Sequence, residues 1–468
     1  MLKDNIIRLV ASIIFFWCLG GCTVGPEFEK TVLYSDKQIE KALDLKPTKN
    51  EIEKSYLMFN DDILNRLLGM AIENSPTVRI AIQKVKQARL SVKIEQVKGL
   101  PTLDAMGQYQ YVKESRNIGY ILNEDVYQIG LDAAWEIDIF GGIRRRTEAA
   151  LANTFATIAN LENVYVSLTA QVALAYIQLR QAQSMQNLLI QNLKALEDSL
   201  LYTQSLRKSG LVNQDQVNQA RMSIQNVKFE LALVQTQERQ SKNQLALLTG
   251  QLPESLDYLL KSQSKNLVDK AFAFDINRFF ELSANVISER PDVKESLYQL
   301  MAQNANVGSA VADLYPKISL SAMLGFQSLH SDGLFNHKSY AYSLTPGFSI
   351  PLFYFGQLKN QVKIQKEKYA ETFAQYENTF LTAAEEIKNA LIALQGSQKQ
   401  YDSAKNSLYE MEEIYQSEEQ RKNAGLANQI ELEQAKVKLL SSKQTLLKAN
   451  AKLYEDVIRF FKAIGSIS

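Results

Sequence analysis

The sequence contains little cysteine or histidine, and beyond its first residues it has no long apolar run. Its 468 residues include two cysteines, Cys18 and Cys22, and two histidines, His330 and His337. Two histidines leave little material for a zinc site or for histidine-based catalysis. Lysine and arginine number 52 against 51 aspartates and glutamates, a balance that gives no electrostatic case for nucleic-acid binding. Because no later segment approaches the roughly 20 residues of a spanning helix, any membrane crossing must be made by strands.

The apolar stretch that does occur lies at the N-terminus. Residues 9–21 read LVASIIFFWCLGG, which is too short for a spanning helix and typical of an export signal over residues 1–21. The tetrapeptide LGGC at residues 19–22 resembles the lipobox of bacterial lipoproteins, in which the cysteine sulfur takes a diacylglycerol. The alternative is an ordinary signal peptide cut nearby, which would leave Cys22 as a free thiol.

A lipid on Cys22 would be the only covalent group, and we expect no cofactor and no metal. With Cys18 removed in the signal peptide, the mature chain would contain no disulfide. Thr23 follows the cysteine, rather than the aspartate that holds many such lipoproteins at the inner membrane, so the resemblance points to the outer membrane. One acylated chain end is a weak anchor alone.

The chain contains the same module twice. A self-alignment at a shift of 215 residues needs no gap over about 175 residues and superimposes prolines and glycines, the positions of strongest backbone constraint. Among the matched pairs are Pro76 with Pro291, Pro101 with Pro316, Gly141 with Gly356, Gly210 with Gly425, and Gly250 with Gly465. We therefore divide the mature chain into an N-terminal lead (22–59), a first repeat (60–250), a linker (251–274) and a second repeat (275–468).

Each repeat begins with a helical stretch and continues into a hairpin. The helices are predicted over 75–101 and 290–316, with prolines in their first turns and at their ends. Alternation of period two then predicts strands. The apolar positions of these strands are Leu103, Ala105, Tyr109, Tyr111, then Tyr127, Ile129, Leu131, Trp135, Ile137, then Ile318, Leu320, Leu324, Phe326, and finally Tyr342, Leu344, Pro346, Phe348, Ile350.

The predicted strands suit a transmembrane barrel better than a half-buried sheet of a soluble protein. They run to about 10 residues or more, they come as hairpins, and aromatic residues lie near their ends. Four strands cannot close a barrel, and an open edge in lipid has unpaired amide groups, so the chain must oligomerise. Two copies would give eight strands with a filled interior, whereas three would give twelve strands around a wet channel. The small and polar inner face favours the trimer.

Long runs without proline or glycine follow each hairpin. The first covers 143–209, which at 1.5 Å per residue makes a helix of about 100 Å. The second covers 357–395 and resumes after Gly396. Apolar residues recur every seven positions in both runs, which predicts helices packed as coiled coils. A free-standing coiled-coil rod would share this spacing, but it would not explain the hairpins.

Several segments together resemble the TolC-type outer-membrane efflux proteins, in the lipoprotein branch that serves resistance-nodulation-division pumps. These segments are CTVGPEF, AWEIDIFGGIRRR, ERPDVKESLYQLMAQNANVGSAVADLYPKISLSAMLGF and SIPLFYFGQLKNQV. The resemblance implies an α+β membrane fold, in which a homotrimer forms one barrel of twelve strands that continues as a periplasmic helical barrel. It also implies an exit duct for small molecules such as drugs, lipid-anchored in the outer membrane, whose partners are a periplasmic adaptor and an inner-membrane transporter.

The same resemblance assigns roles to residues at the ends of the long helices. Those that match the family's tip motif and would meet the adaptor are Arg207, Gly210, Leu211, Arg421, Gly425 and Leu426. The first tip departs from the family pattern, because Leu206 stands where the arginine is usual. Relatives often close the tunnel with an acidic ring, and the aligned position here is Gln434, with Glu431 and Glu433 beside it. Either glutamate is a candidate for setting cation preference.

Other functions remain open at the level of the sequence. A protein-secretion conduit or a metal-ion efflux channel would share the fold, and a surface-anchored coiled-coil protein would lack the pore. An enzyme would need an acid and a base close together, and the best pair is Glu136 with Asp138 at a spacing of two. On the lumen side of a barrel these are expected to be solvated wall carboxylates, so we do not expect an enzyme.

Overall fold

The computed structural model describes residues 23–29, 33–43, 59–113, 117, 123–261 and 285–465, so the predicted signal peptide and Cys22 lie outside the described residues. The chain separates into two compact units, each made of segments from both repeats. The first unit combines Gln83–Ile158, Glu295–Glu377 and the N-terminal residues, and the second combines Val32–Ile82, Ala159–Lys294 and Asn378–Ser468.

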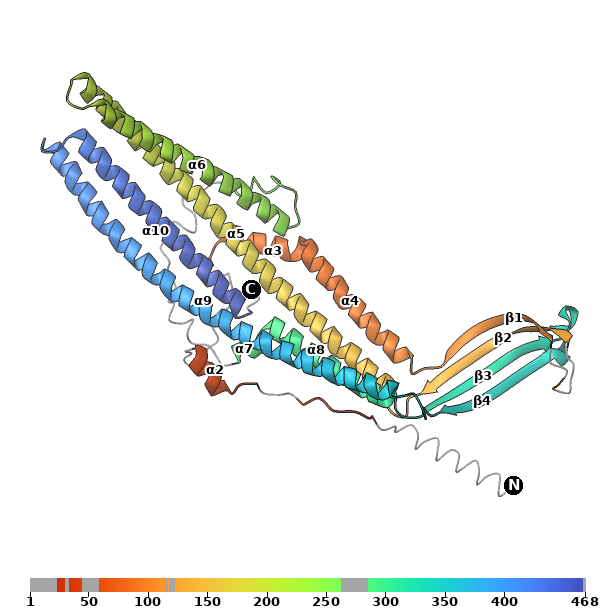
Figure 1. Cartoon of the computed structure of the whole chain (residues 1–468). Helices are drawn as coiled ribbons and strands as arrows, with labels where there is room; N and C mark the ends of the chain where they lie inside the picture. The colour runs from red at the N-terminus through yellow and green to blue at the C-terminus, as the bar shows by residue number, and fades with distance from the viewer. Residues whose placement is uncertain are drawn as a thin grey trace. The chain divides into compact units, whose positions relative to one another are not determined.

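The helices and strands follow the same order in the two repeats (Figure 1). After α2 (Asp36–Leu43), the first repeat contains α3 (Asp62–Asn74), α4 (Pro76–Val97), β1 (Thr102–Lys113), β2 (Asn123–Ile137), α5 (Gly142–Lys208) and α6 (Gln214–Leu248). The second contains α7 (Val286–Glu289), α8 (Pro291–Ala312), β3 (Lys317–Ser328), β4 (Tyr340–Ser349), α9 (Gln357–Asn423) and α10 (Gln429–Ala463). None of the described helices combines the length and the apolarity that crossing a membrane requires.

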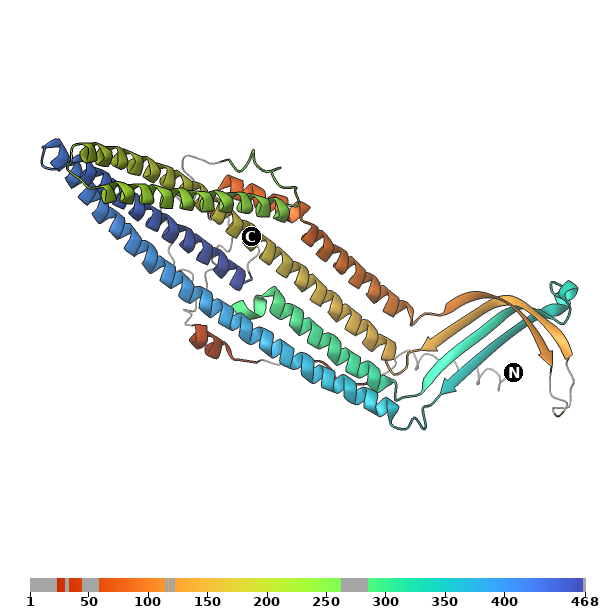
Figure 2. The same ribbon diagram turned by 45° about the horizontal axis from the view of Figure 1, so that its top comes forward.

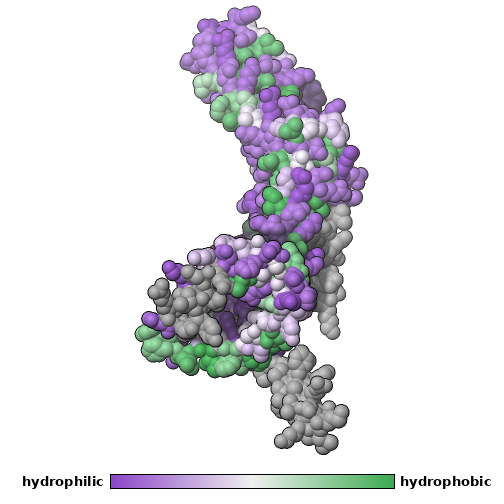
Figure 3. Space-filling model, turned by 90° about the vertical axis from the view of Figure 1, so that its right-hand side faces the viewer, coloured by the Kyte–Doolittle hydropathy of each residue, from purple (hydrophilic) through white to green (hydrophobic). Residues whose placement is uncertain are grey.

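The first unit contains a curved antiparallel sheet in the order β1-β2-β3-β4 (Figure 2). Tyr109 pairs with Tyr127, and Leu131 pairs with Leu324, so the predicted apolar positions of neighbouring strands share one face. Seen from the sheet, the lower part of the molecule shows hydrophobic side chains along its outer border and hydrophilic ones around a hollow (Figure 3). The predicted alternation is therefore confirmed, and the sheet has one face suited to lipid and one suited to water.

The second unit is a bundle of helices with a continuous apolar core. Eight heptad positions of α5 and α9 are at most 6 % exposed in this unit, namely Leu168, Ala175, Ala182 and Leu189 of α5 and Phe380, Ile387, Leu394 and Tyr401 of α9. Asp61 begins α3 by accepting the N–H groups of Ile63 and Leu64, and it also accepts the Tyr176 hydroxyl at 2.8 Å. Burial raises the pKa of Tyr176, so this phenol stays a hydrogen-bond donor.

The duplication predicted at a shift of 215 residues is present in the backbone. This shift maps the bounds of α4, β1, α5 and α6 onto those of α8, β3, α9 and α10. Three pairs of matched glycines have nearly equal positive φ angles: Gly141 and Gly356 (79° and 84°), Gly210 and Gly425 (74° and 75°), and Gly250 and Gly465 (71° each). The repeated glycines therefore mark turns that each repeat needs for the same conformational reason.

Candidate functional site

The first helix-hairpin tip is a glycine turn between α5 and α6. Leu211 N–H donates to Leu206 O at 2.9 Å and Gly210 N–H donates to Arg207 O at 3.1 Å, which together form a Schellman motif. The left-handed φ of Gly210 is required by this motif. Asn213 then begins α6 with a capping box, in which its side chain and that of Gln216 bond to each other's backbone N–H groups.

The second tip, between α9 and α10, repeats this geometry. Leu426 N–H donates to Arg421 O at 2.8 Å and Gly425 N–H donates to Lys422 O at 3.0 Å. Asn428 forms the capping box of α10 with Glu431. Arg421 thus occupies in the second tip the position that Leu206 occupies in the first. The first tip departs from the family pattern only in this side chain, because its turn has the same hydrogen bonds as the second.

The two tips lie at the same end of the second unit in both ribbon views and present similar groups (Figures 1 and 2). The side chains of Leu211 and Leu426 are each 72 % exposed at the apex of their turns. Arg207 is exposed, whereas Arg421 forms an ion pair with Glu418 at 2.6 Å. An apolar apex beside cationic groups suits a protein partner that offers a small apolar pocket with acidic residues around it.

The three residues considered for the periplasmic aperture have different surroundings. Glu431 is exposed and occupied in the capping box, and Gln434 is exposed. Glu433 is only 6 % exposed within this chain and accepts a hydrogen bond from Gln429 Nε2 at 2.8 Å. Burial raises the pKa of Tyr415, and the charges of Glu419 and Glu433 raise it further. By exposure, then, the side chains of Glu431 and Gln434 reach solvent in this chain, whereas the side chain of Glu433 is buried.

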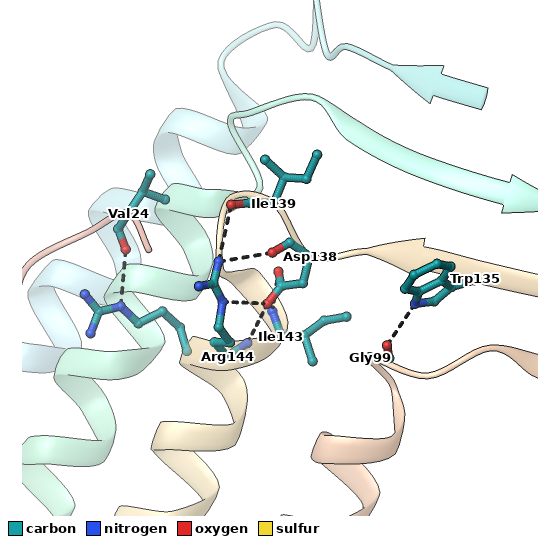
Figure 4. A network of polar contacts seen from close by, with 8 residues as sticks. Val24, Gly99, Trp135, Asp138, Ile139, Ile143 and Arg144 are labelled. Atoms are coloured by element: carbon teal, nitrogen blue, oxygen red, sulfur yellow. Dashed lines mark hydrogen bonds and ion pairs between the residues drawn. The ribbon is translucent and has the colours of Figure 1, made fainter. Parts of the chain in front are cut away.

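The residues that follow Cys22 contact the first unit where strands meet helices (Figure 4). Val24 N–H donates to Phe140 O at 3.3 Å, and Arg145 Nε donates to Val24 O at 3.2 Å. Gly25 lies directly on Gly308 of α8, where a Cβ atom would come within 2.4 Å of the Gly308 Cα. The N-terminal segment is thus fixed between the first repeat and the second, a contact that the sequence did not indicate.

The same junction contains the carboxylate that was considered for catalysis. Asp138 lies beyond the end of β2 and accepts the N–H groups of Ile143 and Arg144 at 3.0 and 2.9 Å, which caps the first turn of α5 (Figure 4). Close by, Trp135 Nε1 donates to Gly99 O at 2.8 Å and ties β2 to the bend before β1. Asp138 therefore has a structural role. The described residues hold no cluster of three or more His, Cys, Asp or Glu side chains that could bind a metal ion.

A buried arginine in the second unit, Arg290, gives the segment ERPDV a structural role. Arg290 is 6 % exposed, and its guanidinium donates to Asp292 and Glu386 at 2.6 Å and to Ala463 O at 2.5 Å. It therefore links the start of α8 to the middle of α9 and the end of α10. The sequence displays the arginine before the proline, but it gives no sign of partners 96 and 173 residues away.

The sequence matches the family described as Outer membrane efflux protein over residues 67–251 and 282–466, once in each repeat. It is 29 % identical over 462 residues to the solvent efflux pump outer membrane protein SrpC of Pseudomonas putida, a match covering 96 % of each chain. It is also 25 % identical to the probable outer membrane lipoprotein SilC of Salmonella typhimurium, covering 97 % of each chain.

Solved structures match over almost the whole length. The outer-membrane channel OprN aligns with a TM-score of 0.84 at 26 % identity, covering 95 % of this chain and 99 % of that one. The open state of the MtrE outer membrane channel of Neisseria gonorrhoeae aligns with a TM-score of 0.78 at 26 % identity, covering 95 % and 98 %. These matches confirm the resemblance that the sequence segments suggested and the duplicated fold of strands and long helices.

Proposed function

The chain belongs to the outer membrane efflux protein family, and on that premise we propose that three copies form one exit duct of a tripartite efflux pump. As a member of this family it is an outer-membrane channel component of a pump and not an enzyme. The observation that carries the proposal is a sheet with one apolar face that ends on both sides in strands without a further neighbour among the described residues. Three copies would close it with twelve strands.

We further propose that the cargo consists of small organic molecules. This is supported by the names of relatives that span nearly the whole chain, which include a solvent efflux protein and an antibiotic efflux protein of Pseudomonas putida. Deleting the gene should increase the accumulation of an apolar fluorescent dye in cells, and the intact gene should restore its exit. The purified protein should form pores in planar bilayers. A water-soluble chain without conductance would contradict the proposal.

Lipidation of Cys22 is supported by two independent observations. The lipobox-like segment LGGC ends at this residue, and a relative that matches 97 % of this chain is named an outer membrane lipoprotein. The residues directly after it, Thr23–Gly25, lie against the junction of strands and helices, where Gly141 approaches Thr23 so closely that a Cβ atom would be 2.9 Å from its Cα.

The helix tips are proposed as the docking site of a periplasmic adaptor, and Arg207, Gly210, Leu211, Arg421, Gly425 and Leu426 would take part. Support comes from two apolar apices with equal exposure and from basic residues in the last turns of α5 and α9. The glycines would hold the turn and the leucines would enter the partner. An inner-membrane transporter of the resistance-nodulation-division type would supply the energy.

A charged aperture near the second tip is the remaining part of the proposal. Glu431, Glu433 and Gln434 lie in the first turns of α10, and a ring of three such side chains in a trimer would bias passage by sign. Glu431 is the strongest candidate, because its side chain is exposed in the single chain whereas that of Glu433 is buried.

A further inference from the structure

The apolar face of the sheet ends in a row of aromatic side chains at the end where β3 turns into β4. Tyr109 lies beside Tyr127 with ring centroids 5.1 Å apart. Phe326 lies beside Tyr340, its partner in the β3–β4 ladder, at 6.3 Å. Tyr109 and Tyr340 are 60 % and 55 % exposed. In membrane barrels, exposed aromatic rings gather where the apolar band meets the lipid headgroups, so this row marks the headgroup level at this end of the sheet.

The loop between β3 and β4, drawn in teal at the far end of the sheet in Figure 1, packs against this row. Its Phe335 meets Phe326 edge to face with ring centroids 5.9 Å apart, and it remains 71 % exposed. Leu329, at the start of the loop, is 42 % exposed. Because Phe326 belongs to the apolar face, Phe335 adds a ring to that face from outside the strand ladder.

Hydrogen bonds within the loop fix its shape. Gly333 N–H donates to His330 O at 3.2 Å, which closes the first turn of the loop. Ser339 Oγ donates to Gly333 O at 2.7 Å, and this bond joins the two short 3-10 turns, Ser331–Gly333 and His337–Ser339. The two turns therefore lie side by side and form one surface, and the exposure of the apolar ring between them follows from the fold of the loop.

The cationic side chains of the loop belong to these two turns. Both histidines of the sequence, His330 and His337, are here together with Lys338, and all three are exposed. In the described part of the chain, none of these side chains forms an ion pair or a hydrogen bond, and Asp332, the one carboxylate of the loop, forms no ion pair either. Lysine offers three donors and even a neutral imidazole keeps one N–H, so the loop offers several donors to an anion.

The cations of the loop have no counterpart in the first repeat. A duplicated hairpin could fold with the same ladder and the same turn position without them, as the first repeat does with its own loop sequence. They are therefore better explained by what the loop touches than by the needs of the hairpin. At the shift of 215 residues, the residues that match His330, His337 and Lys338 are Ser115, Leu122 and Asn123.

We propose that the β3–β4 loop binds a phosphate-bearing glycolipid headgroup of the outer leaflet, with Phe335 at the boundary of the acyl chains and Lys338 and the two histidines on the phosphate oxygens. The inference goes beyond the proposed duct and rests on its sheet crossing the membrane. An apolar ring continuous with the lipid-facing row, beside unpaired cations, is the pattern of an interfacial lipid contact. A soluble anion would engage the cations but leave the ring in water.

Tryptophan fluorescence of the full-length protein in phosphatidylcholine vesicles containing lipid A bisphosphate tests the position of the ring. Phe335→Trp should be quenched by lipids brominated just below the headgroup and protected from iodide in the water. Gln327→Trp is the matched control, because Gln327 is exposed, adjoins Phe326 in β3 and points to the polar face. It should show the opposite response. The signal of the unsubstituted protein is subtracted from both.

Binding of lipid A bisphosphate to the purified protein, measured by native mass spectrometry, tests the phosphate contact. Lys338→Gln should weaken binding about fivefold, the effect of one cation near an anionic surface. Adding His330→Ala and His337→Ala should bring the loss to about tenfold or more. Lys113→Gln, at the end of β1 in the other hairpin, should bind like the unsubstituted protein. Dephosphorylated lipid should bind at least tenfold more weakly.

The outcomes separate this inference from the proposed duct. A protein that does not insert into the vesicles would overturn both. An inserted, conducting protein in which iodide quenches the indole of Phe335→Trp more than brominated lipid does would overturn the lipid contact alone. Equal binding of the dephosphorylated lipid, an equal loss in Lys113→Gln, or full displacement of the lipid by an equal concentration of inorganic phosphate would overturn the headgroup site.

Discussion

At the scale of the residue, stability should change in opposite directions when a side chain is introduced at Gly425 and at Gly396. Gly425 has a φ of 75° in the second tip, whereas Gly396 lies within α9. No atom lies within 4 Å of the Cβ position of either, so the difference is conformational. We expect Gly425→Val to cost about 1–3 kcal/mol and to weaken adaptor cross-linking, and Gly396→Ala to gain roughly 0.5–1 kcal/mol.

Thermal unfolding followed by circular dichroism and adaptor cross-linking in cells would measure the two effects. The matched substitution Gly210→Val tests whether the first tip contributes equally, since its turn has the same hydrogen bonds. Normal cross-linking and drug efflux with valine at both tips would count against a docking role for the turns.

Glu455 of α10 should make stability depend on pH. Burial raises the pKa of Glu455, and the nearby charges of Arg459 and Lys452 offset part of this effect. Between the ordinary and the raised pKa, the folded state binds more protons than the unfolded state, so the free energy of unfolding falls as pH rises through that window. Glu455→Gln removes this loss. The melting temperature of the variant minus that of the unsubstituted protein should therefore increase from pH 4 to pH 7. A difference that stays constant over this range would contradict the prediction.

The tip residues could be predicted from the sequence because a local turn determines them. Gly210 and Gly425 end long runs without glycine or proline, and a left-handed residue is the common way to end a helix. The contacts of Arg145 with Val24 and of Arg290 with Ala463 could not be predicted, because 121 and 173 residues separate the partners. Only folding brings these groups together, and neither the periodicity of apolar residues nor the spacing of motifs predicts such contacts.

At the scale of the element, the spacing of apolar residues along the sequence predicted most of the helices and strands. The run predicted over 143–209 is α5, Gly142–Lys208, and the predicted strands correspond to β1 to β4, except that Ile350 lies one residue beyond the end of β4. The run predicted to pause at Gly396 is one continuous helix, α9, because the flanking heptad residues Leu394 and Tyr401 are buried and hold the backbone. Packing outweighs the cost of about 1 kcal/mol for a glycine inside a helix.

Glu431 caps the N-terminus of α10 and is also the proposed source of charge at the aperture, and the capping boxes offer a way to separate these two roles. The matching position in the first tip is Gln216, which forms the same capping box without a charge. Glu431→Gln should therefore keep the N-terminus of α10 intact and lower the cation preference of the channel. Glu431→Ala should also lose roughly 0.5–1 kcal/mol of helix stability.

Permeability ratios from single channels, together with melting temperatures, distinguish these effects. Glu433→Gln is the companion variant, because its carboxylate is buried in the single chain. Unchanged ion selectivity in both glutamine variants would remove these residues from the aperture.

At the scale of the whole molecule, the duplication explains how a chain with few chemical groups would build the proposed trimer. Each repeat supplies one hairpin and one long helical hairpin, and β2 and β3 join the two repeats within a chain. Among the described residues the outer edges of β1 and β4 have no neighbouring strand, and the proposed trimer would use these edges to join its copies. Function then depends on edges and ends, the sheet edges and the helix tips, rather than on an enclosed site.

The proposed lipid on Cys22 and the sheet should contribute separately to membrane attachment, which a single substitution can test. Cys22→Ala should abolish labelling with palmitate. The protein should still resist extraction with carbonate, because the sheet would cross the bilayer once closed in the proposed trimer, and one acylated end is a weak anchor by comparison. The contacts of Val24 with Phe140 and Arg145 do not involve the cysteine side chain, so the N-terminal segment should keep its place. Ser12→Ala, within the predicted signal peptide, is the control for export. Label retained by Cys22→Ala would refute the lipobox, and release of the variant by carbonate would show that the lipid, not the sheet, holds the protein in the membrane.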